Sequence, residues 1–268
     1  MRTRVITAVV ALAIFLPILF IGGTILQLTA ALLAVIGVYE LFRMRQIQLL
    51  SYEGVLAALG AIVLVLPKNP WFSFLPVNTE KWMLYYFVVM LILGLSVISK
   101  NTYTFDEACF PVLVSLYVGI GFGNFVSARM DKDGLIVLMF AFLVVWSTDI
   151  GAYMFGRKYG KNKLWPEISP NKTVEGALGG ILSAVVVAVI YLIIFPAKQY
   201  FDHSLFTVAL MTIVLSVVGQ FGDLVESAFK RHYGVKDSGK ILPGHGGILD
   251  RFDSMLFVFP IMHLLGLI

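Results

Sequence analysis

The sequence is poor in charged residues and in cysteine. Only 13% of its 268 residues are Asp, Glu, Lys or Arg, whereas 59% are hydrophobic; soluble domains usually carry about 25% charged residues. These charged residues are too few to cover the surface of a water-soluble domain of this length. The composition therefore argues against a soluble protein with a large core. The single Cys109 excludes an intramolecular disulfide and provides no zinc site by itself. The composition therefore predicts an integral membrane protein.

The chain contains a series of long apolar runs. A helix needs about 20 apolar residues to cross a bilayer, and most of these runs reach about that length. The first run exceeds the apolar core of a secretory signal, about 7–15 residues, so we expect an uncleaved helix. The third run is short enough for a re-entrant segment. We predict an all-α, polytopic helical membrane protein with about nine transmembrane helices at residues 5–21, 24–42, 53–67, 82–99, 108–128, 134–155, 174–196, 205–225 and 249–267.

The basic residues indicate an orientation. If the N-terminus, with Arg2 and Arg4, is cytoplasmic, 15 of the 20 Lys and Arg residues face the cytoplasm, as the positive-inside rule requires. The net charge of +4 and the pI of about 9.1 then reflect orientation and attraction to anionic headgroups. We therefore expect a multi-pass protein of the cell membrane and no nucleic-acid partner.

Acidic residues divide the chain into two regions. In residues 1–130, the N-terminal transmembrane helices, Glu40 is the one acidic residue expected near a helix interior. Residues 131–268 carry carboxylates within or at the ends of the predicted spans, and ionisable groups at membrane depth mark functional sites by default. We predict that this second region is catalytic. Its carboxylates are Asp149, Glu175, Asp223, Glu226, Asp250 and Asp253.

Two helix faces in the second region carry paired carboxylates. Asp223, Glu226 and Ser227 share one face by their i, i+3, i+4 spacing, and Asp250 and Asp253 share another. Mg²⁺ is commonly held by one or two carboxylates together with substrate phosphates. The two faces therefore predict a site for phosphoryl or nucleotidyl transfer.

The segment between these faces is basic and rich in glycine. Lys230 and Arg231 open it, and Gly244, His245 and Gly246 lie near its end. Glycine lets the backbone approach a ligand closely, Lys and Arg attract phosphates, and the amides at the start of the ninth helix favour an anion. The simpler alternative is a mobile basic loop, but the carboxylates on both flanks favour a site.

A second polar cluster surrounds the loop between the sixth and seventh predicted spans. Asp149 lies on an otherwise apolar helix and needs a cation or a hydrogen-bond donor. Ser169 and Thr173 are candidate caps for the seventh helix, and Lys172 lies near its start. The other basic residues of this loop, including Arg157, are interpreted as orienting the protein only. The pairs Gly176 with Gly180 and Gly119 with Gly123 indicate close helix packing.

The run Lys236-Asp-Ser-Gly-Lys-Ile-Leu-Pro-Gly-His-Gly-Gly-Ile-Leu-Asp-Arg-Phe-Asp253, with Ser227, Lys230 and Arg231 before it, closely resembles the signature of the phosphatidate cytidylyltransferase family. The segments Asp149-Ile-Gly-Ala-Tyr153 and Ser169-Pro-Asn-Lys-Thr-Val-Glu-Gly-Ala177 also resemble bacterial members. The resemblance covers residues 145–253.

The resemblance implies transfer of cytidylate from CTP to phosphatidic acid, with Mg²⁺ and room for a second cation. It implies a homodimer of multi-span helical chains in the lipid bilayer. Asp223 and Asp250 would be the first metal ligands, with Asp253, Glu226 and Asp149 completing or orienting the site. Because cations can neutralise phosphate charge, we further assign Lys172 and Arg251 to the phosphates. We assign substrate contacts to Lys230, Arg231, His245, Ser227 and Asn171.

Three other functions fit parts of the pattern. A related membrane enzyme could use CTP with another lipid alcohol, but it should lack the full run from Ser227 to Asp253. CDP-alcohol phosphotransferases carry a different acidic motif that this sequence lacks. A secondary transporter also places carboxylates on broken helices, but near the bilayer midplane, whereas these lie at span ends beside basic loops.

Overall fold

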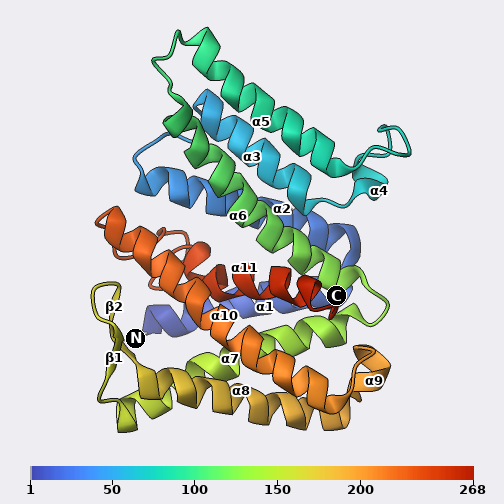
Figure 1. Ribbon diagram of the computed structural model, residues 1–268, viewed down its shortest axis with the longest axis vertical. Coiled ribbons are helices and arrows are strands. Elements are labelled where there is room, and N and C mark those ends of the chain that lie inside the picture. Colours follow the sequence, from blue (N-terminus) through green and yellow to red (C-terminus); the bar gives the residue numbers. More distant parts are fainter. Residues whose placement is uncertain (1) are drawn as a thin grey trace. The chain divides into compact units, whose positions relative to one another are not determined.

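The structure is a computed structural model that describes the backbone of residues 2–268 and the side chains of residues 6, 7 and 9–268. Arg2 and Arg4, which contribute to the predicted orientation, lie outside the described side chains. Helices make up nearly all of the regular structure, so the all-α prediction is confirmed (Figure 1). The one sheet in the described part of the chain is a short hairpin.

Every predicted span corresponds to a helix. Among the described residues, six helices are long and apolar enough to cross a membrane. The third run forms the short α3, Tyr52–Val65, and the first forms α1, Arg2–Ile21, which is apolar over Val9–Ile21. The six long helices are α2 (Gly23–Met44), α5 (Lys81–Ile98), α6 (Phe105–Met130), α7 (Gly134–Tyr159), α8 (Val174–Ile194) and α10 (Leu205–His232).

The chain forms two compact units. The first unit consists of Met1–Ser127 and Asp237–Leu249, and the second of Ala128–Lys236 and Asp250–Ile268. The expected division at residue 130 concerned function and stays a prediction.

The remaining elements are the one-turn helices α4 (Lys68–Trp71) and α9 (Ala197–Tyr200), the strands β1 (Lys163–Trp165) and β2 (Ser169–Thr173), and α11 (Leu249–Leu264).

Glycines bring helices of the first unit into close contact. A Cβ at Gly119 would lie 2.9 Å from Cβ of Leu64, and one at Gly123 would lie 2.6 Å from its carbonyl oxygen. Such approaches exclude a larger side chain, because real Cβ contacts do not become so short. The glycine pair lets α6 pack closely against α3, so its predicted packing role is confirmed.

In the second unit, α7 and α8 lie side by side, and α10 packs against both (Figure 1). A Cβ at Gly176 would lie 2.8 Å from the carbonyl oxygen of Ala152, and one at Gly180 would lie 2.8 Å from that of Thr148. The predicted packing role of the second glycine pair is therefore also confirmed. It brings the end of α7 close to the start of α8.

The outer face of α8 is apolar and exposed. Leu178, Leu182, Val186 and Ile190 follow one another at intervals of one helical turn and are 62%, 57%, 50% and 54% exposed. In water this stripe would be a large unfavourable surface, but against lipid it is the expected one. This face agrees with a helix that crosses the membrane.

Candidate active site

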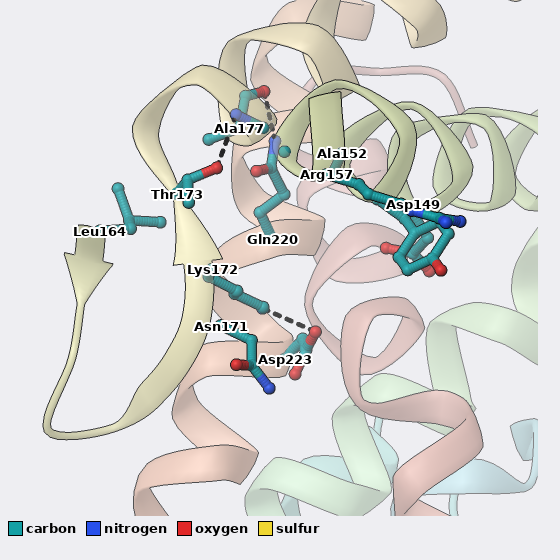
Figure 2. Close-up of a pocket in the computed structure, with 13 residues that line it drawn as sticks. Asp149, Ala152, Arg157, Leu164, Asn171, Lys172, Thr173, Ala177, Gln220 and Asp223 are labelled. Carbon is teal, nitrogen blue, oxygen red and sulfur yellow. Dashed lines mark hydrogen bonds and ion pairs between the residues drawn. The ribbon is translucent and has the colours of Figure 1, made fainter. Parts of the chain in front are cut away.

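A cavity of about 440 Å³ lies in the second unit (Figure 2). Pockets for small molecules usually measure about 300–1,000 Å³. The cavity is lined by apolar surface and by a few polar side chains from three elements. The polar residues that matter below are Asp149 and Arg157 from α7, Asn171 and Lys172 from β2, and Gln220 and Asp223 from α10.

Local hydrogen bonds form the wall that carries Asn171 and Lys172. β1 and β2 pair antiparallel, with Lys163 opposite Thr173. Thr173 caps α8, because its Oγ1 accepts the Gly176 amide at 3.1 Å, which confirms the predicted cap. The expectation that Ser169 also caps this helix is wrong, since Ser169 begins β2.

Glu175 fastens the hairpin to the start of α8. Its carboxylate accepts the Asn162 side-chain amide at 2.7 Å and the Lys161 backbone amide at 3.1 Å. Glu175 lies in the first turn of α8, where the helix dipole also favours a negative charge. These contacts hold the loop that follows α7 beside the start of α8.

An ion pair crosses the cavity from β2 to α10 (Figure 2). Lys172 Nζ lies 2.6 Å from Asp223 Oδ2, and the two side chains are 28% and 33% exposed. Ser227 Oγ donates to Asp223 Oδ1 at 3.3 Å, as its position one turn along the same face predicts. Lys172 and Asp223 thus present opposite charges to whatever enters the cavity.

A second, more deeply buried group of charges lies on α10 and α11. Lys230 Nζ is 3.1 Å from Glu226 Oε2 and 2.7 Å from Asp250 Oδ1. The Glu226 side chain is fully buried, and those of Lys230 and Asp250 are 14% and 8% exposed. The charge of Lys230 is therefore already balanced within the protein.

Three further predicted site residues of the second unit are Asp253, Arg231 and Arg251. A Cβ at Gly222 would lie 2.7 Å from the Asp253 carbonyl oxygen, so α10 and α11 are in backbone contact beside Asp253. Asp253 Oδ1 accepts the amide of Ser254 at 2.7 Å. Arg231 donates to the carbonyl of Ile168 in the hairpin at 3.1 Å, and Arg251 is exposed.

The carboxylates suit a cation that binds together with substrate. Asp149 and Asp223 line the same cavity, together with Lys172. No three His, Cys, Asp or Glu side chains in the described part of the chain form a ready metal site. Carboxylate oxygens are the ligands that Mg²⁺ prefers, and it commonly takes only one or two from protein when phosphates supply the rest. The donor set fits that mode of binding.

His245 and the glycine-rich loop belong to the first unit. The loop turns at Gly244 and Gly246, whose φ values are 76° and 85°, in the region that favours glycine. We expected the amides at the start of α11 to favour an anionic ligand, but in the structure they donate to an anionic side chain of the protein itself. The anion is the Glu40 carboxylate, which accepts the amides of Ile248 and Leu249 at 2.9 Å each.

Sequence reasoning missed two polar residues of the cavity. Arg157 was interpreted as orienting the protein only, yet its side chain lines the cavity with Asp149. The signal was present, because positions 149, 153 and 157 recur at intervals of four and share one helix face. Gln220 donates to the Ala177 carbonyl at 3.3 Å, and it lies one turn before Asp223.

Residues 2–268 match the family model described as the cytidylyltransferase family. The chain belongs to this family. A phosphatidate cytidylyltransferase from Staphylococcus haemolyticus is 49% identical over 267 residues, covering 99% of this chain and 98% of that protein. Phosphatidate cytidylyltransferases from Staphylococcus saprophyticus and Staphylococcus aureus are 48% and 45% identical, with the same coverage of both chains. The resemblance seen in the sequence is confirmed, and this cytidylyltransferase family member is a nucleotidyltransferase.

Proposed function

We propose that this protein transfers cytidylate from CTP to phosphatidate and releases pyrophosphate, in the phospholipid synthesis of the cell membrane. The observation that carries the proposal is the cavity in which Lys172 and Asp223 face each other beside Asp149 and Arg157. It combines cations for phosphates with carboxylates for a metal ion, within a membrane protein. The names of the relatives supply the substrates.

In the proposed reaction a phosphate oxygen of phosphatidate attacks the α-phosphorus of CTP. A new P–O bond forms, the bond from the α-phosphorus to the oxygen that bridges to the β-phosphorus breaks, and pyrophosphate leaves with that electron pair. Phosphate monoesters are largely dianionic near pH 7, so the nucleophile needs no strong base. The main barrier is bringing one anion to another.

Cations in the cavity lower that barrier. Lys172 would leave Asp223 for a phosphate, and Arg157 would add a second positive charge at the same cavity. We propose Asp223 as the first metal ligand, with Asp250, Asp253, Glu226 and Asp149 as candidates to complete the site. Mg²⁺, when bound, would neutralise phosphate charge and orient the two substrates.

We also propose that the active site faces the cytoplasm and that two copies of the chain form a dimer. CTP is water-soluble, whereas the acyl chains of phosphatidate stay in the bilayer. A site at the ends of membrane helices lets both substrates meet without moving the acyl chains into water. Arg251, Arg231, His245, Ser227 and Asn171 stay proposed substrate contacts.

The test uses detergent-purified protein, phosphatidate, labelled CTP and Mg²⁺, followed by extraction of the lipid product. Wild type should form CDP-diacylglycerol, and Lys172→Met and Asp223→Asn should each lose about 100-fold or more in kcat/KM. The matched controls are Lys198→Met and Asp202→Asn, which break an exposed ion pair of the same 2.6 Å length. No product from wild type, or equal losses in the controls, would overturn the proposal.

A further inference from the structure

Glu40 is a fully buried carboxylate outside the cavity. It lies on α2 in the first unit, near the cytoplasmic end that the charge pattern predicts. Burial of a carboxylate costs free energy unless hydrogen bonds replace its hydration. Three donors do so here, and all three come from the segment Asp237–Leu249 of the same unit.

The three hydrogen bonds use both carboxylate oxygens. Oε1 accepts the Ile248 amide at 2.9 Å, and Oε2 accepts the Leu249 amide at 2.9 Å and the Ser238 hydroxyl at 3.0 Å. The two amides belong to the start of α11, where the helix dipole also favours a negative charge. Glu40 thereby joins both ends of the glycine-rich segment.

Two glycines of this segment are explained by Glu40. A Cβ at Gly239 or at Gly247 would overlap the Glu40 carboxylate. Neither residue has a positive φ, so close approach rather than backbone conformation requires glycine at both positions. The segment is therefore shaped around this one side chain.

Further contacts fix the segment in the first unit. Leu249 is fully buried, and its side chain packs on Gly37, one turn before Glu40 on α2. Thr7 Oγ1 donates to the Pro243 carbonyl at 3.0 Å. The segment is thus held at its beginning, its middle and its end.

We propose that Glu40 is a positioning residue for nucleotidyl transfer, acting by holding the segment 237–249 so that α11 begins at Leu249. The chain continues from Leu249 directly into Asp250 and Arg251, so the start of the helix determines where these two residues are presented. This inference rests on the proposed function, in which Asp250 and Arg251 serve the reaction. Glu40 itself would touch neither substrate.

Glu40→Gln is the sharpest variant because it keeps the size of the side chain. One oxygen becomes an NH₂ group, which then faces at least one N–H or O–H donor instead of accepting from it. We expect kcat to fall by about 10- to 100-fold, since misplacing a reacting group by about 1 Å can cost about 100-fold. The KM for CTP should change much less than kcat, because the cavity residues are untouched.

Hydrogen exchange of the intact, detergent-purified protein gives a readout that does not depend on activity. In Glu40→Gln the amides of residues 237–249 should exchange about 10-fold faster or more, as expected for one lost hydrogen bond to a charged group. Ser238→Ala removes one donor but keeps both amide contacts, so it should show the same changes to a smaller extent.

The matched control is Gln27→Leu, also on α2. Gln27 is 3% exposed and accepts the indole N–H of Trp71 at 2.7 Å. This variant should lower thermal stability without changing exchange in 237–249 or kcat. A wild-type kcat in Glu40→Gln, or unchanged hydrogen exchange in residues 237–249 of that variant, would overturn the inference. If Glu40→Gln does not fold, a wild-type kcat and wild-type exchange in Ser238→Ala would overturn it. An inactive wild type would instead remove the proposed function, while exchange would still decide whether Glu40 holds the segment.

Discussion

Replacing Lys230 by Met should destabilise the protein strongly. The ammonium group lies 3.1 Å from the Glu226 carboxylate and 2.7 Å from the Asp250 carboxylate, and none of the three side chains is more than 14% exposed. The variant leaves two buried carboxylates without this cation. Removing one partner of a buried ion pair usually costs about 3–5 kcal/mol.

The matched control is Lys198→Met. Its ion pair with Asp202 has side chains that are 78% and 91% exposed, and pairs of that kind contribute about 0–1 kcal/mol. Thermal unfolding in detergent should therefore move by ~6–20 °C for Lys230→Met and by less than about 4 °C for Lys198→Met, at about 2–4 °C per kcal/mol.

A double-mutant cycle tests the physical cause. Glu226→Gln combined with Lys230→Met should be less destabilised than the sum of the two single variants, because the second change removes a charge that the first left unpaired. Equal shifts in Lys230→Met and Lys198→Met, or simple additivity in the cycle, would refute the conclusion that Lys230 balances the buried charges of Glu226 and Asp250.

Two further predictions concern the metal ion and the orientation. Mg²⁺ alone should raise the unfolding temperature little, because the described carboxylates form no ready three-ligand site. Mg²⁺ together with CTP should raise the unfolding temperature clearly, because the phosphates supply further ligands. A large shift with Mg²⁺ alone would contradict this prediction. In a Cys109→Ser background, Lys198→Cys should react with a membrane-impermeant thiol reagent added to intact cells, and Lys163→Cys should react only after lysis; the reverse pattern would show that the predicted orientation is wrong.

The positions of the helices could be predicted from the sequence, because apolar runs long enough to cross a membrane are strong signals. The polar ends of these helices could not be predicted in the same way. The eighth span was expected over 205–225, whereas α10 continues to His232. Hydropathy marks where a helix leaves the hydrocarbon, not where its hydrogen bonds end. The additional residues of α10 place Lys230 one helical turn after Glu226. Lys230 was expected in a loop, but it is a buried ion-pair partner of Glu226 on the same helix.

The hairpin and the Glu40 contacts were beyond sequence reasoning for a different reason. β1 and β2 are three and five residues long, too short to show an alternating pattern. Glu40 stood out as an isolated acidic residue on an apolar helix, but its partner Ser238 lies 198 positions away in the sequence. Residue types alone do not reveal such a pairing.

The central claim is that cytidylate, and not the terminal phosphate of CTP, is transferred to the lipid. The most direct measurement supplies the purified protein with phosphatidate and Mg²⁺, and with CTP that carries a radioactive label in either the α- or the γ-phosphate. The α-label should appear in the extracted lipid, and the γ-label should appear only in pyrophosphate. A γ-label in the lipid would identify a kinase reaction, and no label in the lipid from either CTP would contradict transfer altogether.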